Sequence, residues 1–313
     1  MAHNKKVICL TPVYNDWESF KILIQKIESL YFLESKTIDI QVIAINDGSS
    51  LEFFDDNFTK VPFSIVNLKK NVGHQRAIAI GLQYINDQIN NFDYVVVLDS
   101  DGEDRPEDII TLLQKAEALN SKKIIFAQRK KRQESLVFKI GYFFYKQFFY
   151  FLTKQKINFG NFSCIPAELL KKIIVQENLW NHYSGSIIQS KIPFDKILLD
   201  RGKRYAGESK MNFTSLVLHG LSSIAVYFDI LSVRILKFTF IGVSICIFSV
   251  LVVLYFKFFT DQSVPGWASN LLLIIFNIIL QLFLITLIVL LMQLSSRKNI
   301  IPPKTDIYKD FID

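Results

Sequence analysis

The architecture of this chain is set by one segment in its middle, Val95-Val96-Val97-Leu98-Asp99-Ser100-Asp101-Gly102-Glu103-Asp104-Arg105-Pro106-Glu107. An apolar run rich in β-branched residues ends in two carboxylates one residue apart, and a helix start follows at Pro106-Glu107. In extended chain, alternate side chains share a face, so Asp99 and Asp101 can point the same way. Open α/β sheets bind ligands at the carboxyl ends of their strands. The segment therefore predicts a buried strand that delivers an acidic pair to a ligand site.

The acidic pair indicates a binding site for a divalent cation. Two hard oxygen ligands suit Mg²⁺ or Mn²⁺, and such a cation can clamp a diphosphate. Asp-x-Asp alone occurs often by chance, but here a buried strand precedes it and Glu103 adds a further acidic position. We therefore expect a Mg²⁺ or Mn²⁺ site around Asp99 and Asp101.

The segments around this strand alternate between short apolar runs and amphipathic stretches, the rhythm of a mostly parallel α/β sheet. Predicted strands cover residues 7–10, 41–45, 63–67, 94–98 and 123–127, and predicted helices cover roughly 16–33, 74–89 and 106–120. A short strand and a helix opening at Pro166 follow within 159–175, and another strand covers 193–199. The aromatic stretch 134–152 suits either a membrane–water boundary or an ordinary core helix.

Composition separates a catalytic part from a membrane part. The 313 residues suffice for one large domain with an appendage, and the apolar half of the composition concentrates after about Arg234. Two uncharged stretches, Phe238–Phe256 and Leu271–Leu294, each approach the ~20 residues that span a hydrocarbon core. Basic residues before the first and after the second predict that both outer ends are cytoplasmic, although Lys257 opposes this bias. The alternative is two buried helices of a soluble bundle.

Charge and cysteines narrow the classes of partner. The net charge of +7 favours phosphate and anionic lipid, and no nucleic-acid-binding module is present, so we expect no nucleic-acid partner. Cys9, Cys164 and Cys246 lack metal-ligand spacing and are expected to be reduced packing residues. No signal peptide precedes the first strand, so the catalytic part is expected in the cytoplasm.

Other segments end at the same predicted sheet edge as Asp99. Leu10-Thr11-Pro12-Val13-Tyr14-Asn15-Asp16 follows the first strand, and Asn46-Asp47-Gly48-Ser49-Ser50 follows the second. Asp47 is placed to accept hydrogen bonds from a base or ribose, or it simply forms a turn with Gly48. Asn71-Val72-Gly73-His74-Gln75 opens a helix, a place where an anion or ligand can approach closely. We expect His74 to serve as a helix-start or nucleotide-contact residue rather than as a catalytic base.

Taken in order, these motifs resemble glycosyltransferase family 2, and within it the polyprenyl-phosphate branch of dolichyl-phosphate mannose synthases and bactoprenol glucosyltransferases. The resemblance continues through Gln128–Arg132, Phe159–Phe162, Ala206–Met211 and Val264–Ser269, and so covers nearly the whole chain. It implies a GT-A type, Rossmann-like, mostly parallel sheet followed by interfacial amphipathic helices and two transmembrane helices. The chain departs from relatives at Asn161, where many have Asp, and at Ser163, where many have Arg. The second span also lacks their Gly-Glu-Tyr-Ile-Gly-Arg ending.

The resemblance also implies roles for individual residues. The nucleotide would be bound by Pro12, Tyr14, Asp47, Gly73, Gln75 and Asp99. The metal and diphosphate would be held by Asp99, Asp101 and Glu103, although many relatives have Gln at the last position. Arg129 and Arg132 would meet the acceptor phosphate, and Ser209 with Lys210 would close the site. The alternative for Arg129–Arg132 is a solvated basic face, and for Lys210 a surface loop.

The chemistry of the residues agrees with this assignment. A lipid monophosphate is largely dianionic at neutral pH, since its second pKa is about 6, and can attack an anomeric carbon without a protein base. The site must instead hold two anions close together, and a metal on one with Arg side chains on the other would do so. Arg201 and Arg204 are available besides Arg129, Arg132 and Lys210.

We therefore expect an inverting, metal-dependent glycosyltransferase that moves a sugar from a nucleotide-sugar donor to polyprenyl phosphate. It would be an integral protein of the bacterial inner (cytoplasmic) membrane, with the catalytic domain and both termini cytoplasmic, and a homo-oligomer is compatible with this arrangement. The expected regions are a catalytic domain over 1–212, an interfacial region over 213–233, a transmembrane hairpin over 234–296 and a tail over 297–313.

Two other functions stay open from the sequence. One is transfer to a hydroxyl of a lipid-linked glycan, which needs a general base, and Asp104 is the nearby spare carboxylate. The other is a non-catalytic membrane partner, which the retained acidic pair disfavours.

Overall fold

The computed structural model describes residues 4–34, 37–54, 58–129, 147, 149–153, 159–206, 220–260, 266–298 and 304–312. The chain divides into two compact units. The first comprises residues 1–143, 156–226 and 303–313, and the second comprises residues 144–155 and 227–302. The last residues of the chain therefore belong to the first unit, although residues 227–302 of the second unit separate them in sequence from the rest of it.

The first unit is built on a seven-stranded sheet in the order β3-β2-β1-β4-β6-β5-β7. The strands are β1 (Lys5–Val13), β2 (Ile38–Asn46), β3 (Phe63–Asn67), β4 (Tyr94–Val97), β5 (Ile124–Arg129), β6 (Ser163–Pro166) and β7 (Phe194–Leu199). All pairings are parallel except those of β6, which runs antiparallel to both β4 and β5. This is the mostly parallel α/β sheet that the alternation of apolar and amphipathic segments predicted.

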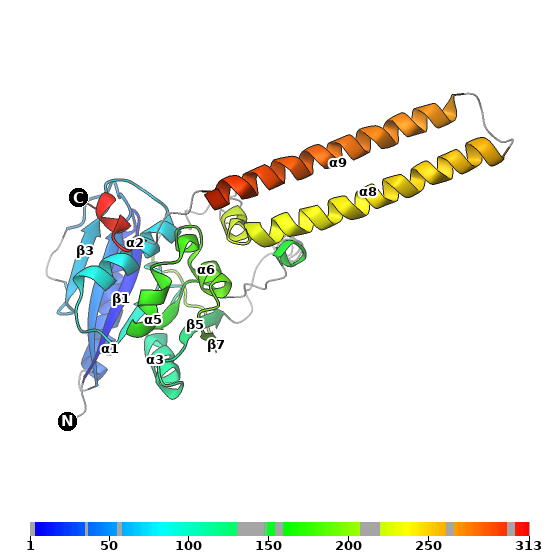
Figure 1. The fold of residues 1–313 in the computed structure, drawn as a ribbon. Coiled ribbons are helices and arrows are strands. Elements are labelled where there is room, and N and C mark those ends of the chain that lie inside the picture. Colours follow the sequence, from blue (N-terminus) through cyan, green and yellow to red (C-terminus); the bar gives the residue numbers. More distant parts are fainter. Residues whose placement is uncertain are drawn as a thin grey trace. The chain divides into compact units, whose positions relative to one another are not determined.

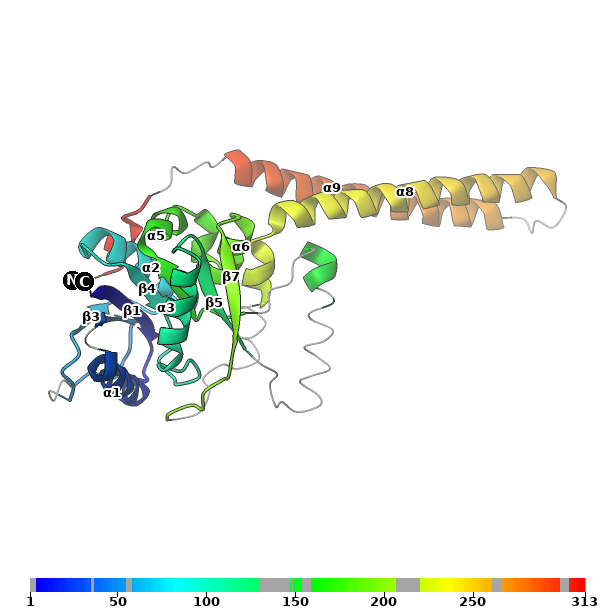
Figure 2. The ribbon, with the colours of Figure 1, turned by 90° about the horizontal axis from the view of Figure 1, so that it is seen from below.

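Helices cover both faces of this sheet (Figures 1 and 2). They are α1 (Trp17–Glu34), α2 (His74–Gln88), α3 (Asp108–Ala118), α5 (Ala167–Ile173) and α6 (Tyr183–Gln189), with short 3₁₀ turns η1 (Glu177–Trp180) and η2 (Ile307–Asp310). In β1, Val7 and Cys9 face the layer that contains α1 and α3, whereas Ile8 and Leu10 face the layer that contains α2 and α5. Burial on both faces explains why the central strands read as continuous apolar runs rather than alternating ones.

The register brings the polar strand ends to one edge. Val13 pairs with Asn46, Asn46 pairs with Asn67, and Leu10 pairs with Val97. The residues that follow β1, β2 and β4 therefore emerge together, and these are the segments that contain Tyr14, Asp47 and Asp99. The sheet thus places the predicted site segments side by side.

The second unit contains two long apolar helices, α8 (Phe228–Phe259) and α9 (Trp267–Lys298). They pack along each other, with Leu282 against Gly242 and a 2.9 Å hydrogen bond from the Thr286 hydroxyl to that of Thr239. Their most apolar windows have mean hydropathies of 2.5 and 2.9, and 11% and 0% of those windows is buried. By length and composition both helices could cross a membrane.

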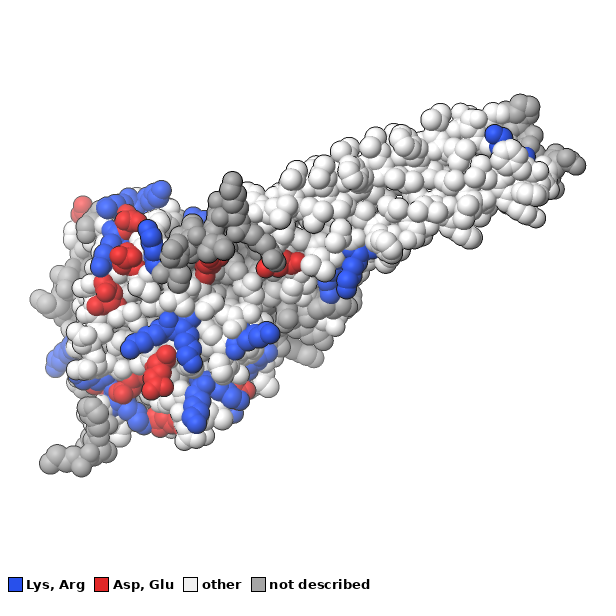
Figure 3. All heavy atoms as spheres, in the orientation of Figure 1, with Lys and Arg blue, Asp and Glu red and all other residues white. Residues whose placement is uncertain are grey.

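The long helices extend beyond the predicted spans. α8 begins at Phe228 rather than at Phe238, because Asp229, Arg234 and Lys237 are compatible with a helix although they interrupt the apolar run. On the face drawn in Figure 3, charged side chains gather on the first unit and are sparse along the hairpin. Of the predicted aromatic stretch 134–152 and the predicted interfacial region 213–233, residues 134–146, 148 and 213–219 lie outside the described residues.

Candidate active site

The loop after β4 is folded tightly on itself. The Asp99 backbone N–H donates to Asp104 Oδ2 (3.0 Å), and the Glu103 N–H donates to Asp101 Oδ1 (3.0 Å). Gly102, between them, has a φ of 89°, and a Cβ there would lie 2.6 Å from the ring of Tyr205. The loop therefore needs glycine at this position to present its acidic side chains.

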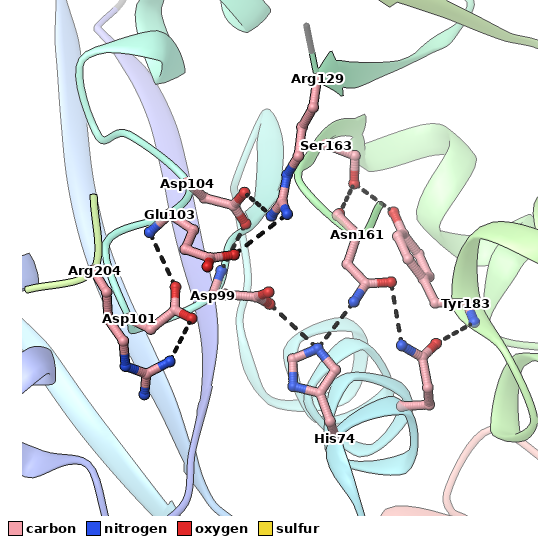
Figure 4. Close-up of polar contacts among 11 residues, drawn as sticks. His74, Asp99, Asp101, Glu103, Asp104, Arg129, Asn161, Ser163, Tyr183 and Arg204 are labelled. Atoms are coloured by element: carbon pink, nitrogen blue, oxygen red, sulfur yellow. Dashed lines mark hydrogen bonds and ion pairs between the residues drawn. The ribbon is translucent and has the colours of Figure 1, made fainter. Parts of the chain in front are cut away.

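Arg129, at the end of β5, lies against this loop (Figure 4). Its guanidinium group donates to Asp104 Oδ1 (2.9 Å) and to Glu103 Oε2 (3.4 Å). Arg201 makes a second ion pair with Glu103. The structure thus places Arg129 against the loop that contains Asp99 and Asp101, with the Glu103 carboxylate between two arginines.

A third arginine, Arg204, bridges two acidic residues. Its Nη1 donates to Asp101 Oδ2 (3.0 Å) and its Nη2 donates to Asp16 Oδ2 (2.8 Å). Backbone bonds tie its loop to the acidic loop, from Gly202 N to Glu103 O and from Tyr205 N to Asp101 O, both 2.9 Å. Asp16 was not predicted as a site residue, although it lies within the motif quoted for the first strand end.

A relay of side chains reaches Asp99 from the opposite side (Figure 4). The Tyr183 backbone N–H donates to Gln75 Oε1 (2.7 Å), and Gln75 Nε2 donates to Asn161 Oδ1 (3.3 Å). Asn161 Nδ2 then lies 2.9 Å from His74 Nε2, which lies 3.2 Å from Asp99 Oδ1. Because a backbone N–H can only donate, it fixes both amides, so that the Asn161 N–H faces His74 Nε2.

This relay leaves Asp99 suited to a cation. Asp99 Oδ1 is shielded from solvent, and His74 Nε2, 3.2 Å away, can donate to it only when that nitrogen carries a proton. A proton on His74 Nε2 could be donated to Asp99 Oδ1, but it would then face the Asn161 N–H, which is also a donor. A divalent ion on Asp99 Oδ1 would satisfy the carboxylate without disturbing the relay, so the residues present fit a metal.

The protein supplies only part of a coordination sphere. The described residues contain no group of three or more His, Cys, Asp or Glu side chains arranged to hold a metal. Mg²⁺ commonly binds proteins through one or two carboxylates and completes its shell with waters and substrate phosphates. Asp99 and Asp101 match that smaller donor set.

The crowded carboxylates perturb one another. Burial raises the pKa of Asp104 to about 7, and the neighbouring Asp99 charge acts in the same direction. Burial and Asp99 also raise the pKa of Asp101. The pKa of Asp99 is lowered, because His74 and Arg129 outweigh the opposing effect of burial. The loop is therefore a strongly anionic site that added positive charge would relieve.

The predicted nucleotide-side residues lie along the same edge. Both Asp47 oxygens accept backbone N–H groups, from Val72 (2.7 Å) and Gly73 (3.1 Å), so this buried carboxylate holds the loop before α2. Gly73 has a φ of 90°, and a Cβ there would meet nothing within 4 Å, which leaves its side of the loop open. Tyr14 is 44% exposed, whereas Pro12 is buried.

Three of the predicted site residues cannot be placed. Arg132, Ser209 and Lys210 lie outside the described residues. Conversely, the relay through Gln75, Asn161 and His74 was not predicted, although each of these residues lies within a motif quoted from the sequence.

The match to known proteins agrees with this geometry. Residues 8–174 match the family model described as Glycosyl transferase family 2, and the chain belongs to that family. Within the family, its relatives include enzymes named for polyprenyl carriers, as the motifs predicted.

Three relatives illustrate this. An uncharacterized glycosyltransferase of Bacillus subtilis (strain 168), YkcC, is 24% identical over 86% of this chain and 83% of its own length. An undecaprenyl-phosphate 4-deoxy-4-formamido-L-arabinose transferase of Photorhabdus laumondii is 26% identical over 68% of this chain and 65% of its own. The bactoprenol glucosyl transferase of Shigella phage SfV is 26% identical over 71% and 73%.

A solved structure supports the fold. Glucosyl-3-phosphoglycerate synthase from Mycobacterium tuberculosis, in complex with Mn²⁺, UDP-glucose and phosphoglyceric acid, superposes with a TM-score of 0.51 at 12% identity, covering 72% of this chain and 80% of its own. The sheet is therefore of the GT-A type, with a helical C-terminal part added.

Proposed function

We propose that this chain is a membrane-anchored, metal-dependent, inverting glycosyltransferase that moves a sugar from a nucleotide-sugar donor to polyprenyl phosphate. The observation that carries the proposal is the acidic loop, in which the buried Asp99 Oδ1 is left without a donor when His74 Nε2 accepts from Asn161, while arginines pair with the neighbouring carboxylates. The names of the relatives support the acceptor.

The reaction follows from the charges at this site. A phosphate oxygen of the lipid attacks the anomeric carbon from the face opposite the leaving group, and the bond from that carbon to the diphosphate breaks. The bonding pair leaves with the nucleoside diphosphate. A bound Mg²⁺ or Mn²⁺, held by Asp99 and Asp101, would neutralise charge on that diphosphate. Arg129 and Arg201 lie where they can orient an anionic acceptor once their bonds to Glu103 are exchanged.

The structure disfavours the alternative that needs a general base. Asp104, the carboxylate nominated for that role, is 3% exposed and has one oxygen on the Asp99 N–H and the other on Arg129. A base must lie within hydrogen-bond reach of the acceptor hydroxyl, and this side chain faces the protein instead. A lipid phosphate needs no such base.

The two units bear on membrane topology. Residues 156–226 and residues 303–313 belong to the same folded unit, which supports a hairpin that starts and finishes on one side of a membrane. If α8 and α9 cross, they cross and return. Basic residues flank the hairpin at both outer ends, which supports the cytoplasmic face of a bacterial inner membrane.

The test is a donor and acceptor screen. Full-length protein in detergent would be incubated with Mn²⁺, labelled nucleotide sugars and polyprenyl phosphate. A lipid-linked product that releases sugar in mild acid is expected. Activity on lipid diphosphate oligosaccharides but none on the monophosphate would refute the proposed acceptor.

A further inference from the structure

The segment that follows the hairpin is anchored in the core of the first unit. Residues 304–312 include the turn η2, and Tyr308 on it is 1% exposed, packed in the same hydrophobic layer as α2. Its ring meets that of Tyr84 edge-to-face at 5.8 Å. The burial of a whole tyrosine side chain is unusual for a solvated tail.

A buried glutamine on α2 depends on this segment. Gln83 is fully buried, its Nε2 donates to Lys304 O (2.9 Å), and its Oε1 accepts from the Tyr308 N–H (3.2 Å). Farther along α2, Asp87 accepts from the Tyr308 hydroxyl and pairs with Lys309 at 3.1 Å. Removal of the segment would leave polar atoms of Gln83 buried without these partners.

The same segment also contacts the chain just before the site loop. Ile312 forms a β-bridge with Leu68, and the Lys69 N–H donates to Phe311 O (2.9 Å). The Phe311 ring also lies 5.8 Å from that of Trp180, which immediately precedes the segment leading to Tyr183. Residues 304–312 therefore contact the flank of α2, the exit of β3 and the turn η1.

These three contact points converge on the donor side of the site. Between Lys69 and α2 lie Val72 and Gly73, whose N–H groups Asp47 accepts. The first turn of α2 carries His74 and Gln75, and Gln75 is held by the Tyr183 N–H. Loop 69–75 is therefore held at both ends. The C-terminal segment bonds to Lys69 at the start of the loop, and it also packs against α2, the helix at the end of the loop.

We propose that residues 304–312 are a brace for the donor-binding loop 69–75, with Tyr308 as its anchor. The brace acts by position, through α2 and the β3 exit, and it makes no contact with substrate. This inference rests on the proposed function only in assigning the loop to the donor. It makes the chain beyond the hairpin part of the catalytic unit rather than a free tail.

The test compares full-length protein in detergent with Tyr308→Ala and with a chain that ends before Lys304. Tyr31→Ala is the matched control, because Tyr31 packs against the hydrophobic layer on the opposite face of the sheet. Hydrogen–deuterium exchange is expected to show lost protection within residues 68–88 in Tyr308→Ala and in the shortened chain, but not in the control. A synthetic peptide of residues 302–313 is expected to restore protection to the shortened chain.

Kinetics supply a second readout. In Tyr308→Ala the KM for the nucleotide sugar is expected to rise about tenfold with a smaller change in kcat, as when a binding loop loses its support. Unchanged protection in residues 68–88, or equal loss across the whole first unit with no rescue by peptide, would overturn the brace. If Tyr308→Ala does not fold, Phe311→Ala takes its place. Should no donor be found, the exchange and rescue measurements still decide the brace while the proposed function fails alone.

Discussion

At the scale of single residues, Asp99 is defined by its neighbours. His74 lies on one side of its carboxylate and Asp104 accepts its backbone N–H on the other. Its partner Asp101 is held by Arg204 and by the Glu103 N–H. Both carboxylates are therefore held by protein contacts before any ligand binds, which reduces the cost of assembling the site.

We expect Asp101→Ala to reduce transfer by at least about a hundredfold, the scale of losing one electrostatic element of an active site. The variant should stay folded, because Asp101 is partly exposed and its carboxylate bonds polar groups of the loops, Arg204 and the Glu103 N–H. Transfer rates measured with Mn²⁺ test the loss of activity, and circular-dichroism melting tests whether the variant stays folded. Full activity in the folded variant would contradict the metal site.

The contribution of Asp87 to stability is expected to depend on pH. The Tyr308 hydroxyl, together with Lys309, lowers the pKa of Asp87 below its ordinary value of 3.8. A carboxyl with a lowered folded-state pKa adds stability above its unfolded pKa and loses it as the pH falls through the folded value. We therefore expect wild type to melt higher than Asp87→Asn near about pH 6, with the difference vanishing well below about pH 4. A difference that does not depend on pH would show that charge is not its cause.

At the scale of elements, the two loops that carry the charged groups are interlocked. Gly202 lies so close to the acidic loop that an added Cβ would be 2.1 Å from Gly102 O. Its own N–H donates to Glu103 O. Arg201 and Arg204 flank it, so the position of one glycine decides whether both arginines reach their carboxylates.

Gly202→Ala is therefore expected to separate these loops. We predict a loss of about 1–3 kcal/mol in unfolding free energy and a larger fractional loss of activity. Gly160→Ala is the control, since a Cβ there would meet nothing within 4 Å. Equal behaviour of the two variants in denaturant melts and rate measurements would contradict the interlock.

The elements themselves were largely predictable, and their long-range side-chain contacts were not. The strand Phe63–Asn67 was predicted to the residue, because burial and turn residues leave a local pattern. The hydrogen bond between Asn161 and His74 joins residues 87 positions apart, and Tyr308 reaches Gln83 across 225 positions. Side chains in such contacts leave no periodic pattern in the sequence. Sequence analysis therefore singled out Asn161 only as a departure from relatives, and it placed Tyr308 in a tail.

At the scale of the whole molecule, the hairpin presents polar groups as well as apolar ones to its surroundings. Asn277 and Gln281 on α9 are exposed, and Gln281 Nε2 donates to Asn277 Oδ1 (2.8 Å). In hydrocarbon, the remaining donors and acceptors of these amides would need partners, and a second copy of the same helix offers them.

We accordingly expect Asn277→Leu with Gln281→Leu to weaken self-association of the full-length protein in lipid vesicles. Energy transfer between labelled copies measures it, with the exposed Leu284→Ala change as the control. Retention of wild-type energy transfer in the double variant would place any association elsewhere.

The membrane topology of the hairpin can be tested at the end of α8. Thr260 follows the last residue of α8. In sealed, right-side-out membranes, Thr260→Cys is expected to react with a maleimide that cannot cross the bilayer. Reaction only after the membrane is opened would contradict a crossing hairpin.

The native thiols make such mapping practicable. Cys9 and Cys164 lie buried beside β4, and burial raises the pKa of both thiols, that of Cys9 to about 12. Cys246 is buried within the hairpin. Because the thiolate is the reactive form, Cys9 and Cys164 should stay silent toward water-soluble alkylating reagents at neutral pH, and Cys246 is shielded from such reagents by its burial. The unaltered chain is thus its own blank, and any single cysteine placed on its surface becomes an isolated reporter.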